Sequence, residues 1–120
     1  MKVRGIRGAT QIDRDEPGLM QEAVVELMQE VMRANSLSTG ELISVIFTVT
    51  HDIKSDFPAA SARAMGLGDV PLLCSTEIPV PGSLPRTIRV LVHCETERNQ
   101  KQIAHIYLRG TTVLRKDLAQ

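Results

Sequence analysis

The chain has 120 residues, which is enough for one domain with a hydrophobic core but not for two. Its 14 basic and 14 acidic residues cancel, and one Tyr, two Phe and no Trp leave few aromatic side chains, which argues against binding to nucleic acid or to an anionic membrane. No apolar run reaches the roughly 20 residues that span a bilayer, and the first residues lack the pattern of a signal peptide. We therefore expect a single domain over residues 1–120, located in the cytoplasm.

The cysteines and histidines do not form a recognisable set of ligands. Cys74 and Cys94 are too few and too far apart for a metal knuckle, and a reducing compartment argues against a disulfide between them. His51, His93 and His105 lack the spacing of metal ligands and are better explained as solvated or core residues. We expect no metal site and no cofactor.

The first predicted strand, residues 3–10, contains Gly5 and Gly8 close to Arg4 and Arg7. Glycine within a strand often marks a bulge or the close approach of another group to the backbone. Two interpretations stay open. Either the two arginines are solvated charges on an edge strand, or the glycines make room beside Arg7 for a ligand.

Residues 15–35 are predicted to form the one long helix. Asp15 is a suitable N-cap, Pro17 suits the first turn, and Asn35 suits a left-handed exit. Apolar residues recur at helical spacing and predict a buried face; they are Met20, Ala23, Val24, Leu27, Met28 and Val31.

Short apolar segments separated by turn residues make up the rest of the chain. Ser38 and Glu41 have the spacing of a capping box. Pro58 and Gly66 favour the start and the end of a short helix. We expect the tail from about residue 110 to be flexible. The remaining predicted elements are strands at residues 42–49, 70–75 and 103–108, and the short helix at residues 57–66.

Residues 87–92 form the most apolar predicted strand, and Arg89 lies in its middle. A strand that is apolar on both faces is normally covered on both faces, and an unpaired buried charge costs roughly several kcal/mol. Arg89 is therefore expected either to pair with a carboxylate of the protein or to bind an anionic ligand. The other arginines and the carboxylate of Glu77 favour the second interpretation, in which Arg89 binds an anionic ligand. A loop carboxylate such as Glu77 is nevertheless usually solvated.

These elements predict an α+β fold with a mixed sheet of about five strands, packed by one long helix and one short helix. The strands at 42–49 and 88–92 are apolar enough to be buried on both faces, whereas two helices cover about one face. A partner subunit is the simplest cover for the other face. We therefore expect a symmetric oligomer, in which a site can lie between chains.

Six segments occur in one order and at one spacing: RGIRGAT (4–10), FPA (57–59), VP (70–71), IRV (88–90), HIYL (105–108) and VLRKDL (113–118). Together they closely resemble the trimeric, monofunctional chorismate mutases with a pseudo-α/β-barrel, over essentially the whole chain. The resemblance implies a homotrimer with sites between subunits. It also implies conversion of chorismate to prephenate by a pericyclic rearrangement in phenylalanine and tyrosine biosynthesis, with no cofactor and no covalent intermediate.

The same resemblance implies roles for individual residues. Arg89 would contact the ether oxygen, which gains negative charge as the C–O bond breaks, and a substrate carboxylate. Arg7 and Tyr107 would hold the enolpyruvyl carboxylate. Glu77 would accept a hydrogen bond from the ring hydroxyl, with Cys74 beside it.

The remaining implied residues enclose the substrate. Phe57, Ala59, Leu72 and Leu73 would wall the pocket from the neighbouring chain, Arg63 and Arg115 would lie at its mouth near the ring carboxylate, and Leu114 belongs to the tail that closes it. One position departs from the family pattern, because this chain has Ala60 where similar proteins carry lysine. Neutralisation of the ring carboxylate therefore shifts to Arg63 and Arg115.

Two other functions fit parts of this pattern. One is a trimeric imine or enamine deaminase, whose similar-looking subunits also pair an arginine with an acid between chains. The other is a non-enzymatic domain that binds a carboxylate metabolite. The set of Arg7, Glu77, Arg89 and Tyr107 favours the mutase. Cys74 is disfavoured as a covalent nucleophile because no histidine is assigned to activate it.

Overall fold

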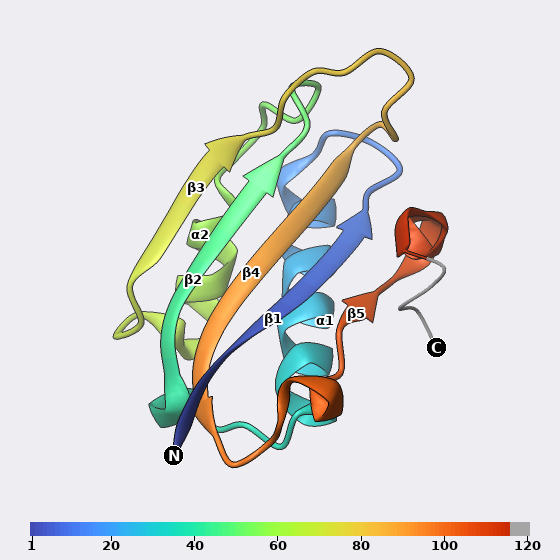
Figure 1. Cartoon of the computed structure of the whole chain (residues 1–120). Coiled ribbons are helices and arrows are strands. Elements are labelled where there is room, and N and C mark those ends of the chain that lie inside the picture. The colour runs from blue at the N-terminus through green and yellow to red at the C-terminus, as the bar shows by residue number, and fades with distance from the viewer. Residues whose placement is uncertain (116–120) are drawn as a thin grey trace.

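A mixed five-stranded sheet forms one layer of the molecule, with both α-helices behind it (Figure 1). The computed structural model describes residues 1–115, and the strand order is β3-β2-β4-β1-β5. β4 is antiparallel to both β1 and β2, whereas β3 and β5 add at the two edges in parallel. The strands are β1 (Lys2–Gln11), β2 (Leu42–Val49), β3 (Leu72–Thr76), β4 (Thr87–Thr96) and β5 (Ile106–Tyr107).

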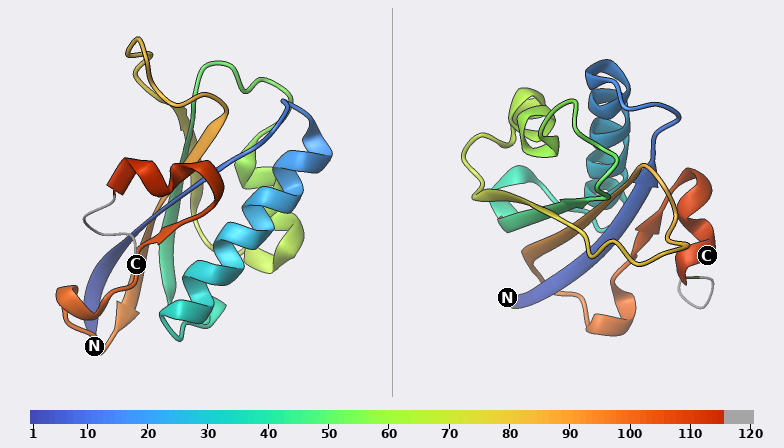
Figure 2. Two further views of the ribbon diagram at one scale, coloured as in Figure 1. Left: turned by 90° about the vertical axis from the view of Figure 1, so that its right-hand side faces the viewer. Right: turned by 90° about the horizontal axis from the view of Figure 1, so that it is seen from above.

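Both α-helices lie on the same face of this sheet (Figure 2). α1 (Pro17–Ala34) runs along the strands, and α2 (Pro58–Ala62) lies beside it. All six apolar residues that the helical spacing predicts to be buried on α1 are buried. They pack in one core with side chains such as Phe47 and Val90 from the sheet. The predicted α+β architecture is therefore confirmed.

The other face of the sheet is left open in the single chain. Along β4 the exposure alternates, so that Ile88 and Val90 are buried while Arg89 and Leu91 are exposed. As the sequence analysis expected, the two α-helices cover only one face, and the cover of the other face by a partner subunit stays a prediction. The open face is where Arg89 points.

The two ends of α1 differ from the prediction because the predicted capping residues make tertiary hydrogen bonds instead. The carboxylate of Asp15 accepts the backbone N–H groups of Lys54 and Ser55 at 2.9 and 3.1 Å. At the other end Asn35 is not left-handed, with φ of −108°, and Ser36 has the positive φ of 54°. The buried Asn35 side chain donates to Val31 O and Ala104 O and accepts from Ala104 N.

Several other boundaries also differ. β3 begins at Leu72, because Pro71 has no N–H to donate to a strand partner. The last strand has two residues instead of six, and Gln100–Gln102 before it forms a 3₁₀ turn. The predicted short helix ends as α2 at Ala62 and continues as a wider turn, Arg63–Leu67, in which Gly66 has a φ of 109°. The capping box of Ser38 and Glu41 is confirmed.

Gly8 lies where β1 packs closely against side chains of β4 and α1. A Cβ added there would lie 2.9 Å from Val90 Cγ1 and 3.2 Å from Leu27 Cδ1, whereas one added at Gly5 would meet Leu91 Cδ1 at 3.6 Å. Gly8 therefore makes room for Val90 of β4 and Leu27 of α1, and not for a ligand beside Arg7. β1 is also not a simple edge strand, because β5 pairs with it at Gly8.

We predict that Gly8→Ala lowers the free energy of unfolding by about 1–3 kcal/mol, the usual cost of overpacking a core. Urea denaturation followed by circular dichroism measures the change. Gly5→Ala is the matched control on the same strand and should cost less, because its new methyl group makes an ordinary contact. An equal loss in the two variants would contradict the close packing inferred at Gly8.

Candidate active site

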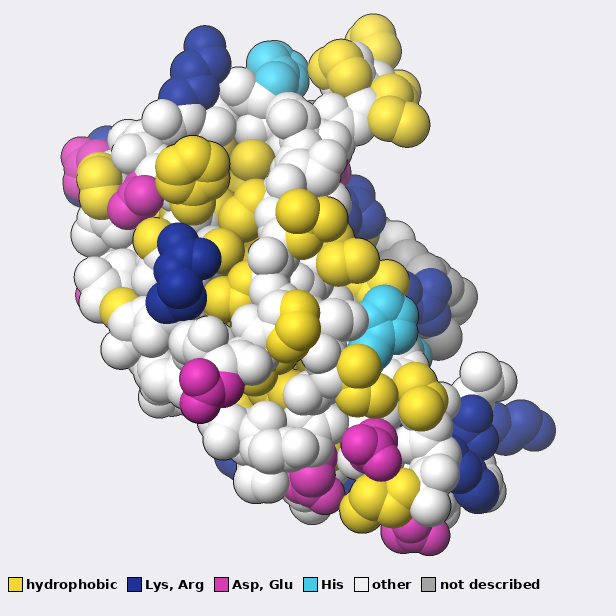
Figure 3. All heavy atoms as spheres, turned by 90° about the vertical axis from the view of Figure 1, so that its left-hand side faces the viewer, with side chains coloured by type: hydrophobic (Ala, Val, Ile, Leu, Met, Phe, Trp, Pro, Cys, Tyr) yellow, Lys and Arg dark blue, Asp and Glu magenta, His cyan; other side chains and the backbone are white. Residues whose placement is uncertain are grey.

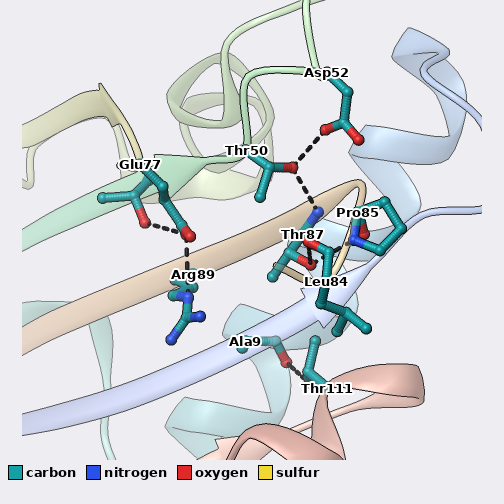
Figure 4. Close-up of polar contacts among 10 residues, drawn as sticks. Ala9, Thr50, Asp52, Glu77, Leu84, Pro85, Thr87, Arg89 and Thr111 are labelled. Atoms are coloured by element: carbon teal, nitrogen blue, oxygen red, sulfur yellow. Dashed lines mark hydrogen bonds and ion pairs between the residues drawn. The ribbon is translucent and has the colours of Figure 1, made fainter. Parts of the chain in front are cut away.

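Arg89 and Glu77 form an ion pair on the open face of the sheet (Figure 4). The distance between Arg89 Nε and Glu77 Oε2 is 3.2 Å. Glu77 directly follows β3, and its backbone N–H donates to Val49 O at 2.9 Å, which fixes the backbone at the end of the strand. The Glu77 side chain is 17% exposed and that of Arg89 is 45% exposed. Pairing with a carboxylate is thus present, and the guanidinium still reaches the surface.

Arg7 lies next to this pair on the same face. The register between β1 and β4 pairs Arg7 with Leu91 and Ala9 with Arg89, which makes the two arginines diagonal neighbours. Arg7, Leu91 and Tyr107 line one hollow. The backbone N–H of Arg7 donates to Nδ1 of His105 at 2.9 Å, and so ties β1 to the segment that carries Tyr107. The fold thereby gathers Arg7, Arg89, Glu77 and Tyr107 on one face.

A polar clamp holds the start of β4, just before Arg89. Arg86 has a positive φ of 47°, and its backbone N–H donates to both carboxylate oxygens of Asp52, at 3.2 and 3.0 Å. The hydroxyl of Thr50 donates to Asp52 at 2.6 Å and accepts the backbone N–H of Thr87 at 3.0 Å (Figure 4). Burial would raise the pKa of Asp52, but the hydrogen bonds from Thr50 and Arg86 outweigh it and hold this pKa below its ordinary value.

The C-terminal 3₁₀ helix, Arg109–Arg115, lies against β1 near the β5 edge (Figure 2), and Arg109 at its start lies 3.4 Å from Glu26 of α1. Buried Thr111 anchors it, because its hydroxyl donates to Ala9 O and Leu108 O at 3.1 and 2.6 Å. Leu114 is half-buried in this helix. The side chain of Arg115 lies outside the described part of the chain. The expected flexibility of the tail stays a prediction.

β3 divides its predicted site residues between the two faces of the sheet. Leu73 points to the open face and is 62% exposed. Leu72 and Cys74 are paired in register with Val45 and Phe47 and pack against the core on the helical face. Within one chain, Cys74 therefore does not lie beside Glu77 as the family resemblance implies.

The predicted site residues of α2 and its flanks also lie on the helical side. Phe57 precedes the helix and is 68% exposed, whereas Ala59 is only 5% exposed and packs in the core. Arg63 is exposed in the turn that follows. Figure 3 shows exposed hydrophobic side chains near the helical side and, separately, on the projecting loop that contains Ile78 and Val80. Phe57 and Arg63 are thus available to a neighbouring molecule but not to the Arg89 face of their own chain.

Sequence reasoning missed Thr48. Its hydroxyl donates to Glu77 Oε2 at 2.8 Å, and it is the cross-strand partner of Arg89. The sequence contains a signal for this residue. Ser44 and Thr48 are the polar residues of a strand that is otherwise apolar, and because they lie an even number of residues apart they share one face of it. Treating β2 as continuously apolar concealed this polar face.

Within residues 1–115, no three His, Cys, Asp or Glu side chains come together as a metal site would require. Among the helices of the same residues, none has both the length and the apolarity needed to cross a membrane. Both cysteines are free thiols. What the open face offers is cationic and hydroxyl groups beside one carboxylate, which suits a small molecule with carboxylates and a hydroxyl.

Known proteins are similar to this chain in sequence and fold over almost their whole length. Residues 3–118 match the family model "Chorismate mutase type I". The chain is 50% identical over 117 residues to chorismate mutase AroH of Thermus thermophilus, covering 97% of this chain and 96% of that protein. It is 34% identical over 120 residues to chorismate mutase AroH of Bacillus subtilis, covering 99% and 94%. A solved chorismate mutase from Clostridium thermocellum superimposes with a TM-score of 0.90 at 41% identity, covering 92% of this chain and 98% of that one.

We predict that Asp52→Asn lowers the free energy of unfolding by about 1 kcal/mol at pH 7, because the clamp loses hydrogen bonds to a charged acceptor. The folded-state pKa of Asp52 is depressed, so its contribution is present above the unfolded pKa and is lost as the pH falls through the folded pKa. Urea unfolding at pH 7 and at pH 3 measures this. The gap between wild type and variant should shrink at pH 3, and an equal gap at both pH values would count against the clamp.

Proposed function

The chain belongs to the chorismate mutase type I family, and from that premise we propose how its residues convert chorismate to prephenate. As a chorismate mutase it is an isomerase of aromatic amino acid biosynthesis. The observation that carries our proposal is the Arg89–Glu77 pair, whose guanidinium reaches the surface beside Arg7 on the open face of the sheet. The cytoplasmic location expected from the sequence stays a prediction.

The reaction is a unimolecular rearrangement, so it requires neither a nucleophile nor a base. The enzyme must hold the substrate in a folded conformer and place charge where the transition state becomes polar. In our proposal Arg89 donates to the ether oxygen as the C–O bond breaks and also contacts a substrate carboxylate. A planar guanidinium with several parallel donors can serve both oxygens at once.

The other residues of the open face bind the rest of the substrate. Arg7 and Tyr107, which line one hollow, hold the enolpyruvyl carboxylate. Glu77 accepts a hydrogen bond from the ring hydroxyl. Leu114 and Arg115 close the mouth of the pocket, where Arg115 and Arg63 attract the ring carboxylate in the absence of a lysine at position 60.

We further propose that three copies of the chain assemble and share each site between two of them. Exposed Leu73 and Leu91 make the open face an unfavourable surface to leave in water. Of the predicted wall residues, Phe57, Ala59 and Leu72 lie on the helical side of their own chain, whereas Leu73 points to the open face. A neighbouring subunit that presents Phe57 and Arg63 to the Arg89 face would complete the pocket.

We predict that the purified protein consumes chorismate and forms prephenate without added metal or cofactor. The loss of chorismate absorbance, with the product identified by mass spectrometry, measures the reaction. Pretreatment with a chelator should leave the rate unchanged, because the proposed chemistry uses only charges and hydrogen bonds of the protein. Inert chorismate together with rapid hydrolysis of an enamine would support the deaminase alternative instead.

We predict that two inactive variants restore activity in mixed trimers. Arg89→Ala lacks the transition-state donor, and Phe57→Asp places a carboxylate against a dianion, so each alone should be nearly inactive. After refolding together in equal amounts, about a quarter of the interfaces would join an intact Arg89 face to an intact Phe57 side. Activity should recover to about that fraction of wild type, measured as prephenate formation.

Mixing the two folded variants without unfolding is the control and should restore little if subunits exchange slowly. Native mass spectrometry verifies that hybrids have formed. No recovery in verified hybrids would place Arg89 and Phe57 in the pocket of one chain and would contradict the shared site.

A further inference from the structure

We infer that Thr48 is a positioning residue of the active site: its hydroxyl anchors Glu77, which in turn fixes Arg89 by its Nε and leaves both terminal nitrogens of the guanidinium available. This inference rests on the proposed roles of Arg89 and Glu77. It concerns a residue that does not touch the reacting atoms in that proposal.

Thr48 and Arg89 both contact the same oxygen of Glu77, Oε2. Thr48 Oγ1 donates to Oε2 at 2.8 Å, and Arg89 Nε lies 3.2 Å from the same Oε2. The three residues come from β2, the end of β3 and β4, and Thr48 and Arg89 are directly paired across β2 and β4. Figure 4 shows Glu77 directed toward Arg89 above the sheet. The triad is therefore fixed by the register of three adjacent strands.

This geometry leaves specific atoms unoccupied. Within residues 1–115, neither Glu77 Oε1 nor either Nη group of Arg89 makes a hydrogen bond, and the closest atoms of the ion pair are Oε2 and Nε. Oε1 is thus the oxygen that can accept the ring hydroxyl, and the Nη groups are those that can reach the ether oxygen and a carboxylate. The arrangement separates internal contacts, at Oε2 and Nε, from contacts with the substrate.

The effect of Thr48 on the site goes beyond the energy of its one hydrogen bond to Glu77. A carboxylate held by Arg89 alone can rotate about its side-chain bonds and carry the guanidinium with it. The hydroxyl of Thr48 comes from a β-branched side chain with a restricted χ1 angle, so it holds Oε2 at a nearly fixed point. Because a displacement of about 1 Å at a reacting group can cost about a hundredfold in rate, an anchor two contacts away from the substrate affects turnover.

The test compares Thr48→Val with wild type in chorismate turnover. Valine keeps the shape and strand preference but removes the donor. We expect kcat to fall about tenfold or more while KM changes by less than threefold, since Arg89 would lose its alignment for the transition state and not its charge. Thr48→Ser retains the hydroxyl and should stay within about threefold of wild type in kcat.

A matched control is Thr10→Val in β1. The hydroxyl of Thr10 is buried and has no hydrogen-bond partner, so the same substitution there should leave kcat unchanged. Thermal unfolding of all variants checks that they fold. Should Thr48→Val fail to fold, Thr48→Ala replaces it with the same expectation for kcat.

A double-mutant cycle separates positioning from a general structural effect. In the Glu77→Ala background, Thr48→Val should change the remaining rate by less than twofold, because the residue through which Thr48 acts is absent. Wild-type kcat in Thr48→Val, or an undiminished effect in the Glu77→Ala background, would overturn the inference. If wild type itself did not convert chorismate, the proposed function would fail instead, so the two failures are distinguishable.

Discussion

The charge of Arg89, near the start of β4 and between the buried residues Ile88 and Val90, is the constraint around which the open face of the sheet is arranged. Its Nε lies 3.2 Å from Glu77, and its side chain remains 45% exposed. An ion pair this accessible contributes only about 0–1 kcal/mol to stability, whereas each fully buried aliphatic side chain of α1 contributes about 1.5–3 kcal/mol. The helical layer therefore holds the fold together, and the ion pair mainly fixes the position of a guanidinium. Because the ion pair serves to position a side chain, polar residues such as Thr48 and Asp52 hold Glu77 and the start of β4 in place.

β4 contributes to both the core and the open face, because its side chains alternate between the two faces of the sheet. Ile88, Val90 and Val92 complete the core under α1 and α2, and Arg89 and Leu91 between them face the open side. A shift of register by one residue would exchange the two sets and place the charge in the core. The positive φ of Arg86, held by Asp52, fixes where the strand begins and so which set faces which side. The clamp at the start of β4 thus protects both the core and the site.

Strong sequence periodicity made the core predictable, whereas contacts between elements did not follow from the sequence. The helical spacing of its apolar residues predicts the buried face of α1. The apolar residues around Arg89 in the sequence indicate that its charge needs a partner or a ligand. Asp15 and Asn35 were assigned to helix ends because capping is local, but both side chains bond to distant backbone. β5 is short partly because the His105 side chain takes the N–H of Arg7 that a longer strand would have paired. The face on which Cys74 lies depends on the register of β3 with β2, which no local pattern determines.

The placement of the Glu77 carboxylate close to a dianionic substrate needs an explanation, because like charges repel. An isolated Glu77 would repel chorismate, but its Oε2 is already bound by the Arg89 cation and the Thr48 hydroxyl. The ion pair is neutral as a unit, so the net positive charge offered to the substrate comes from Arg7 and from the arginines proposed at the mouth. The remaining oxygen can then act as a hydrogen-bond acceptor for a hydroxyl at little electrostatic cost. Such an acceptor distinguishes a substrate that carries the hydroxyl from a simple dicarboxylate, because an acceptor that a bound ligand shields from water is costly to leave unpaired.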